Sequence, residues 1–263
     1  MSHAGADVKR LEETLSHIGK KYIVLSGKGG VGKSTVAVNL AYALTALGKR
    51  VGLLDCDLHG PSIPTMTGTV NYISDGNETS FVPAETQNGL LKILSSQFFL
   101  HNLDDSVIWR GPLKHSVIAQ FIGHTTWGEL DYLIIDCPPG TGDEPLSVAQ
   151  TAKPDAAIIV TTPQAVATAD VRKSIDFCKK LSLPIFGIIE NMSGFVCPHC
   201  KTQTDIFGIH GGKEMADETG ESFLGRIPIE PSIVPFADNG RPIVEAAPDS
   251  VASGVFRAMA TML

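Results

Sequence analysis

Short, continuously apolar runs alternate along the chain with segments long enough to form helices. The runs are rich in β-branched residues and lack an apolar–polar alternation, which is typical of parallel strands buried on both faces. Strands are predicted at 22–27, 50–57, 91–96, 131–137, 156–162 and 185–191, and helices at about 33–47, 113–122, 143–152 and 165–181. This order predicts an α/β fold with a doubly wound, mostly parallel sheet flanked by helices, which binds ligands at the carboxyl ends of its strands.

The remaining segments complete one domain. The polar stretch 68–90 is predicted to be a surface excursion with at most a short hairpin. A glycine-bounded helix and a short strand are expected between 208 and 232, and a helix that begins at Pro248 closes the chain. We expect residues 1–20 to form a short N-terminal segment and residues 21–263 to form a single domain.

Composition narrows the class of protein. The 263 residues are 43% hydrophobic, enough for a sizeable core, and carry a formal net charge of -7. Such a charge leaves no broad basic surface, so we expect neither nucleic acid nor a membrane as partner. No apolar run approaches the roughly 18 residues of a membrane span, and no export signal is seen, so a cytoplasmic protein is expected.

The stretch "GKGGVGKST" at 27–35 lies between a predicted strand and a predicted helix and fits the phosphate-binding pattern GxxxxGK[ST]. Its glycines let backbone N–H groups converge on phosphate oxygens, Lys33 neutralises the terminal phosphates, and the Ser34 hydroxyl can ligate Mg²⁺. A turn that only caps the helix would explain one or two glycines, but not four in register with Lys and Ser. The predicted nucleotide-binding residues here are Gly27, Lys28, Gly29, Gly30, Val31, Gly32, Lys33, Ser34 and Thr35.

Acidic residues follow two of the other predicted strands. Asp55 and Asp57 flank one residue and so lie on the same side of an extended chain, where both can face a nucleotide. Asp136 ends an apolar strand, as does the acid that holds Mg²⁺ in P-loop NTPases. The prolines and glycines of 136–143 predict a loop that switches between a few conformations. Asn191, at the end of a later strand, offers a donor and an acceptor to a purine edge.

The stretch "CPHC" at 197–200 supplies Cys197 and Cys200, half of the four ligands that zinc or an iron-sulfur cluster usually takes. A redox pair is less favoured because such pairs normally begin a helix after an early strand, and an incidental turn is the plain alternative. The other three cysteines are expected to be small buried hydrophobes, and disulfides are not expected: Cys56, Cys137 and Cys178.

Lys28 makes the loop resemble the deviant Walker A group, "xKGGxGK[ST]", of the nitrogenase iron protein and the arsenite-pump, septum-positioning and partition ATPases. The resemblance implies that Lys28 reaches the phosphates of a partner protomer and is catalytic together with Lys33 and Asp57, with Asp57 orienting the attacking water. It also places Asp55 near Mg²⁺ and implies that Asn191, with Pro228 and Ile229 of "RIPIEP", lies at the adenine. A solvated lysine at the mouth of the turn is the alternative for Lys28.

The chain as a whole resembles the Mrp/ApbC iron-sulfur cluster carrier ATPases. The stretches that carry this resemblance run from about 20 to 245: "GKGGVGKSTVAVNLA", "LLDCDLHGPSIPTM", "WRGPLK", "DYLIIDCPPGTGDEPLSVAQ", "VTTPQAVATADVRKSI", "GIIENMSGFVCPHC" and "FLGRIPIEP". The resemblance implies an ATP-hydrolysing homodimer in which Cys197 and Cys200 of both protomers bridge a labile 4Fe-4S cluster. It implies a cluster donor and apo iron-sulfur recipient proteins as partners. His59 stands where many relatives have an aromatic residue.

Three alternatives remain open. An ATP-dependent electron donor like the nitrogenase iron protein would take its ligands from separated single cysteines, whereas this chain offers a close pair. A positioning or partition ATPase would carry a basic amphipathic helix or a basic DNA-binding face, and the C-terminal stretch has one arginine. Zinc held by two CPHC pairs is the structural counterpart of the cluster.

Overall fold

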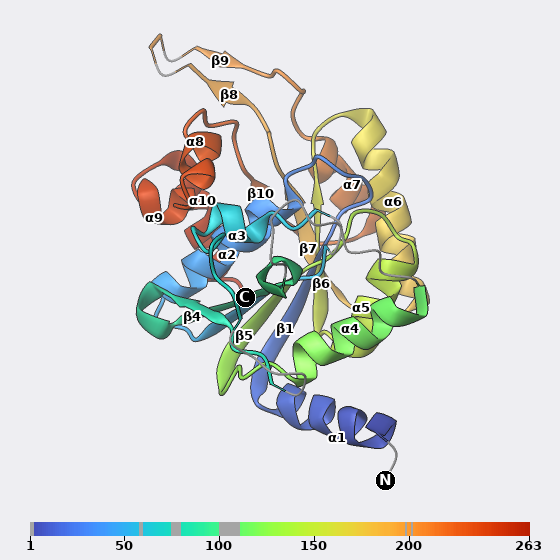
Figure 1. The fold of residues 1–263 in the computed structure, drawn as a ribbon. Helices are drawn as coiled ribbons and strands as arrows, with labels where there is room; N and C mark the ends of the chain where they lie inside the picture. The colour runs from blue at the N-terminus through green and yellow to red at the C-terminus, as the bar shows by residue number, and fades with distance from the viewer. Residues whose placement is uncertain (1–2, 58–59, 75–79, 100–110, 198, 201) are drawn as a thin grey trace.

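An eight-stranded sheet forms the centre of the molecule (Figure 1). The computed structural model describes residues 3–57, 60–74, 80–99, 111–197, 199–200 and 202–263. Within these ranges the strand order is β10-β7-β6-β1-β5-β2-β4-β3, and all pairings are parallel except the antiparallel pair of β3 and β4. The bounds are β1 Ile18–Leu25, β2 Val51–Asp55, β3 Ala84–Thr86, β4 Leu91–Ser95, β5 Leu130–Asp136, β6 Ala156–Thr161, β7 Ile185–Glu190 and β10 Phe223–Arg226.

Helices cover both faces of the sheet (Figure 1). One face carries α2 (Lys33–Ala46), α9 (Ile243–Ala246) and α10 (Val251–Ala260), with α3 (Ile63–Met66) and α8 (Ile233–Asp238) nearby. The other carries α4 (Gly111–Gly123), α5 (Asp143–Ala152), α6 (Ala165–Lys180) and α7 (Gly211–Thr219). The described residues also include 3₁₀ turns at Gln87–Gly89 and Ser96–Phe99. None of the described helices is long and apolar enough to cross a membrane.

The core lies where the central strands meet the helix layers. Leu133, Ile134 and Ile135 of β5 are fully buried although they point alternately to both faces, which is why the strand is apolar without alternation. α2 is buried on nearly all sides, because it lies under α10 as well as on the sheet. The predicted doubly wound α/β fold is therefore confirmed.

Most predicted elements lie within two residues of the observed ones, with two exceptions at the ends of the chain. β1 begins at Ile18, four residues before the prediction, because Ile18 and Lys20 continue the pairing with β5. The last helix begins at Val251 rather than at Pro248, because the Ser250 hydroxyl accepts a hydrogen bond from Ser253 N at 3.2 Å and caps it there.

The N-terminal segment contains a helix that the sequence pattern did not predict. α1 (His3–Ser16) packs against α4, and Arg10 Nε and Thr14 Oγ1 each donate to the Gly123 carbonyl at 3.1 Å. β1 runs across residue 20, the predicted end of this segment. The excursion 68–90 returns to the sheet through β3, which forms a short hairpin with β4.

Candidate nucleotide and cysteine site

The phosphate-binding loop joins β1 to α2, as predicted, and two of its glycines have left-handed backbone conformations. Gly30 and Gly32 have φ near +79° and +81°, which L side chains rarely adopt. A Cβ on Gly32 would lie 2.2 Å from Asn191 Nδ2. Gly27 has a different reason to lack a side chain, because its Cβ would lie 2.4 Å from the Asp170 carbonyl oxygen of α6. A side chain on Gly27 would therefore collide with α6, and the predicted contact of its backbone with phosphate stays a prediction.

The loop borders an open cavity of about 220 Å³. A Cβ on Gly29 or Gly30 would meet no protein atom within 4 Å, so both glycines face open space. Backbone N–H groups of such a loop can bind phosphate oxygens. The residues that line the cavity are Ser26, Lys28, Gly29, Gly30, Gly32, Lys33, Ser34, Thr35, Asp57, Gly60, Ser62, Met66 and Pro139.

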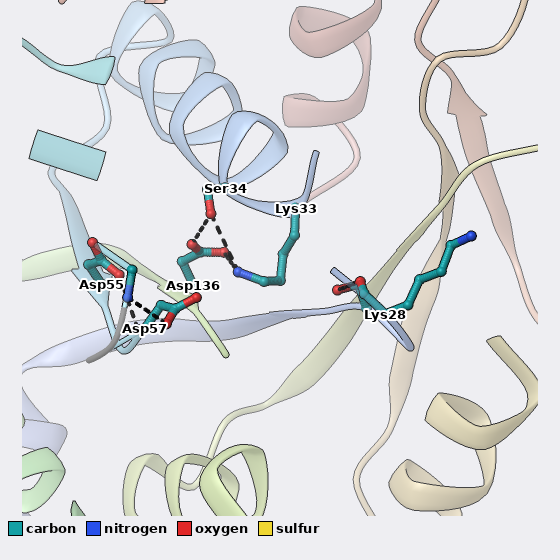
Figure 2. A network of polar contacts seen from close by, with 8 residues as sticks. Lys28, Lys33, Ser34, Asp55, Asp57 and Asp136 are labelled. Carbon is teal, nitrogen blue, oxygen red and sulfur yellow. Dashed lines mark hydrogen bonds and ion pairs between the residues drawn. The ribbon is translucent and has the colours of Figure 1, made fainter. Parts of the chain in front are cut away.

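Asp136 at the end of β5 holds both side chains of the signature Lys–Ser pair (Figure 2). Lys33 Nζ donates to one carboxylate oxygen at 2.6 Å, and Ser34 Oγ donates to the other at 2.5 Å. Burial raises the pKa of Asp136 even though the contact with Lys33 lowers it. Burial by itself lowers the pKa of Lys33, but the adjacent carboxylate raises it above its ordinary value, so the lysine stays charged.

Asp55 lies fully buried at the end of β2, next to Asp136 in the paired register. Burial and then the charge of Asp136 raise the pKa of Asp55 to about 8. Its carboxylate accepts hydrogen bonds from Asp57 N and from Ser95 Oγ, each at 3.1 Å. Ser95 was missed by the sequence reading; its position at the end of β4, a strand paired with β2, is the signal that could have found it.

The oxygen-rich donors at these strand ends suit Mg²⁺. The cation prefers carboxylate and hydroxyl oxygens, and Ser34, Asp55 and Asp136 offer only these. Asp136 contacts Ser34, and Asp55 and Asp136 are opposite each other in the pairing of β2 and β5. The donors therefore fit the ion, and their assignment as its ligands stays a prediction.

The remaining predicted catalytic residues lie at the rim of the cavity. Asp57 lines the cavity, and one of its carboxylate oxygens accepts a hydrogen bond from Gly60 N at 3.2 Å. The side chain of Lys28 extends away from Lys33 and Asp136 (Figure 2). Within one protomer Lys28 therefore does not join the Lys33–Asp136 pair. The predicted switch loop 136–143 is anchored by a hydrogen bond from Gly140 N to the Ser26 carbonyl at 2.9 Å.

The residues predicted at the base cluster beyond the end of β7. Asn191 is buried, and its Nδ2 donates to the Val31 carbonyl of the phosphate loop at 2.9 Å. Ile229, which follows Pro228, donates its backbone N–H at 2.8 Å to the carbonyl of Gly194, three residues after Asn191. The structure thus brings Asn191 to the loop and Ile229 to the segment that follows Asn191, while the contact of these residues with adenine stays a prediction.

Cys197 and Cys200 lie at the tip of a small hairpin of β8 (Phe195–Val196) and β9 (Gln203–Thr204), which projects beyond the sheet at the end opposite α1 (Figure 1). Cys197 is half-buried and Cys200 is exposed. The turn is held by a hydrogen bond from Cys197 N to the Thr202 carbonyl at 3.0 Å. Hydrogen bonding by Thr202, whose Oγ1 lies 3.3 Å from the Cys200 sulfur, is the largest contribution that lowers the pKa of Cys200, to about 7.

The other three cysteines behave as predicted. Cys56, Cys137 and Cys178 are buried, and burial raises the pKa of each thiol above its usual range. Among the residues whose positions are described, no three His, Cys, Asp or Glu side chains converge as a metal site. Of the five cysteines, three are buried and the two on the hairpin are accessible to solvent, and the assignment of these two as metal or cluster ligands stays a prediction. His59, noted in the sequence, lies outside the described residues.

Comparison with known families agrees with this geometry. A family model described as ParA, NUBPL iron-transfer P-loop NTPase, matches residues 17–263. The chain belongs to this family. The predicted resemblance to iron-sulfur cluster carrier ATPases of the deviant Walker A group is thereby confirmed.

Curated relatives of this NUBPL-type NTPase carry names from iron-sulfur biochemistry. The iron-sulfur cluster carrier protein of Methanocaldococcus jannaschii is 51% identical over 89% of this chain and 81% of its own length. The cytosolic Fe-S cluster assembly factor CFD1 of Saccharomyces cerevisiae is 51% identical over 82% of this chain and 76% of its own.

Solved structures show the same fold with nucleotide. A nucleotide-binding protein from Archaeoglobus fulgidus, in complex with ADP and with cobalt found in it, is 41% identical with a TM-score of 0.79, over 89% of this chain and 91% of that one. The septum site-determining protein MinD of Pyrococcus horikoshii, complexed with Mg-ADP, is 26% identical with a TM-score of 0.66, over 92% and 94%. The NUBPL-type chain thus has the predicted P-loop NTPase fold.

Proposed function

We propose that the protein is an ATP-hydrolysing homodimer that carries a labile 4Fe-4S cluster and transfers it to apo iron-sulfur proteins in the cytoplasm. The observation that carries this proposal is the cysteine pair at the tip of a projecting hairpin, with Cys197 half-buried and Cys200 exposed, which offers two sulfur ligands per protomer. A two-fold axis duplicates the pair, so two protomers supply the four thiolates of one cluster. The names of the relatives support the same cargo.

The phosphate site supports hydrolysis by positioning and charge. The loop amides and Lys33 bind the phosphates, and Mg²⁺, held by Ser34, Asp55 and Asp136, would neutralise further phosphate charge. Asp57 orients a water whose oxygen attacks the γ-phosphorus, while the bond from that phosphorus to the β-phosphate oxygen breaks. ADP and inorganic phosphate leave, and the proton of the water passes to the phosphate or to solvent. Lys28 of the partner stabilises the negative charge that develops.

The cargo is tested with Cys197→Ala/Cys200→Ala after anaerobic reconstitution with iron and sulfide. The parent is expected to hold about four iron ions and as many sulfides per two chains, because a 4Fe-4S cluster takes four thiolates. The double variant is expected to lose both, together with the broad visible absorbance. Val196→Ala/Gln203→Ala, on the same hairpin with both thiols intact, is the matched control and keeps the cluster.

Two outcomes would contradict the proposal. Unchanged iron and sulfide in the cysteine variant would show that the ligands lie elsewhere. Zinc without sulfide in anaerobically prepared parent protein would favour a structural metal at the hairpin. ATP hydrolysis by the parent is measured separately as release of phosphate.

A further inference from the structure

Glu190 is a fully buried carboxylate at the end of β7, and neither the phosphate site nor the cysteine pair accounts for it. One of its oxygens accepts hydrogen bonds from the Ser193 hydroxyl and from His210 N, the latter at 3.1 Å. The other accepts from Gly212 N at 2.6 Å. A buried carboxylate is costly without such donors, so these three contacts offset the free-energy cost of burying it.

These donors are the two ends of the segment that carries the cysteines. The chain leaves β7 after Glu190, runs out through the hairpin of β8 and β9, and returns at His210, the residue directly before α7. We call residues 193–210 the cysteine excursion. Gly212 packs close, since a Cβ there would lie 3.1 Å from the Glu190 Cβ. The single carboxylate of Glu190 therefore closes the base of the excursion that presents Cys197 and Cys200.

The neighbouring residue connects this base to the phosphate loop. Asn191 follows Glu190 directly, and its Nδ2 donates to the Val31 carbonyl at 2.9 Å. Asn191 N also donates to the Thr161 carbonyl of β6 at 2.8 Å, so Asn191 contacts both the phosphate loop and the neighbouring strand. If phosphate binding displaces Val31, the displacement would thus act on Asn191. The residue before it, Glu190, binds both ends of the cysteine excursion.

We infer that Glu190 is a positioning residue that couples nucleotide binding at the phosphate loop to the position of the cysteine excursion. The inference deepens the proposed function and rests on it for the purpose of the coupling. Its physical basis is that a charged acceptor with three donors fixes the excursion to the strand end, so the two sites move together. Without that acceptor the excursion stays folded as a hairpin but no longer follows the loop.

The test measures alkylation of Cys197 and Cys200 by mass spectrometry in metal-free protein, with and without ADP or a non-hydrolysable ATP analogue. In the parent, nucleotide is expected to change the alkylation rate by about fivefold or more, the lower end of ordinary coupling between sites. In Glu190→Gln, the ratio of the alkylation rate with nucleotide to the rate without it is expected to be close to one. The glutamine amide has one acceptor oxygen where the carboxylate has two. Its NH₂ group, a donor, would therefore face a buried backbone N–H, also a donor, and one hydrogen bond would be lost.

Controls separate coupling from folding. Glu190→Gln should still bind ADP, because the phosphate loop and Asn191 are unchanged, and should unfold cooperatively on heating. Glu218→Gln, on the exposed face of α7 where Glu218 pairs with Arg172 at 2.6 Å, should keep the parent's ratio. Ser193→Ala removes one donor to Glu190 and leaves the two backbone donors, so it should reduce the ratio of alkylation rates only partly. It is the variant to test if Glu190→Gln does not fold.

Three results would overturn the inference. The first is a parent protein whose alkylation rate is the same with and without nucleotide. The second is a folded Glu190→Gln that keeps the parent's ratio of rates. The third, which applies if Glu190→Gln does not fold, is a Ser193→Ala protein with an unchanged ratio. None of these results concerns iron content or ATP hydrolysis, so each would leave the proposed function standing. Conversely, failure of the protein to bind a cluster would refute the proposed function. The effect of nucleotide on the alkylation rate would still show whether the two sites are coupled.

Discussion

Asp136 is the residue on which the nucleotide site converges. It binds Lys33 and Ser34 at once and lies opposite Asp55 in the sheet. Two buried carboxylates beside one lysine leave excess negative charge, which is why burial and mutual repulsion raise the pKa of Asp55 to about 8. A cation at this point would relieve the repulsion, and this residue-scale electrostatic imbalance supports the predicted Mg²⁺ site.

At the same scale, Tyr42 of α2 gives a prediction for alkaline pH. Tyr42 is buried, and burial raises its pKa from 10.0 to about 12. Because the unfolded chain ionises first, stability from the neutral phenol is present below pH 10 and is lost as the pH rises towards 12. Two pKa units correspond to roughly 3 kcal/mol as an upper bound. The melting temperature of the parent should therefore fall more steeply above pH 10 than that of Tyr42→Phe, so the difference between the two should change there.

Below pH 9 the difference in melting temperature between these two proteins should be constant, which is the internal control. A parallel fall of both melting curves above pH 10 would contradict the assignment to Tyr42.

At the scale of elements, the contact of α1 with α4 depends on one small residue. Gly123 ends α4, and its carbonyl accepts from Arg10 and Thr14 of α1. A Cβ on Gly123 would lie 3.1 Å from the Leu11 Cα, closer than ordinary van der Waals contact. Backbone of one helix therefore lies directly on backbone of the other, and α1 has little room to move aside.

Gly123→Val is expected to push α1 away from α4 and to cost about 1–3 kcal/mol, as overpacking usually does. Limited proteolysis or hydrogen exchange of residues 3–16 measures the detachment, and chemical denaturation measures the free energy of unfolding. Gly254→Ala in α10, where a Cβ meets nothing within 4 Å, is the control and should unfold no more easily than the parent. Equal protection of α1 in the parent and in Gly123→Val would show that the contact is not tight.

At the scale of the whole molecule, the strand order brings chemistry from distant parts of the chain to one edge. β1 lies between β5 and β6, and β2 lies between β5 and β4, so the phosphate loop, the acids and Asn191 gather at the carboxyl ends of neighbouring strands. Lys28 is the exception, because it extends away from Lys33 and Asp136 (Figure 2). This direction is consistent with the proposed role of Lys28 in a second protomer.

Lys28→Ala is expected to bind ATP through Lys33 and to lose about 10³-fold or more in hydrolysis, as when an arginine finger is removed. Asp57→Ala should also be inactive. Equal mixing with free exchange makes about half of the dimers mixed, each with one intact composite site, so about a quarter of the parent's phosphate release should return. No recovery in dimers shown to be mixed would place Lys28 in its own subunit's site or outside catalysis.

The sequence alone determined those features of this protein that depend on residues close together in the chain. Continuous apolar runs predicted the buried strands, and the phosphate loop, the acids at strand ends and the cysteine pair were predicted from residue type and spacing alone. The strands and the places of these residues in the fold are as predicted, because glycine conformations and strand burial depend on near neighbours in sequence; the chemical roles of the residues stay predictions. α1 was missed, since its packing partner is α4, more than a hundred residues away.

Only the tertiary structure decided how these parts are joined. The contact of Ser95 with Asp55, that of Asn191 with Val31, and the closure of the cysteine excursion by Glu190 each join different elements. In sequence, Glu190 reads as one more polar residue at a strand end. The burial of its carboxylate against returning backbone is set by where α7 docks on the sheet, which no local pattern encodes.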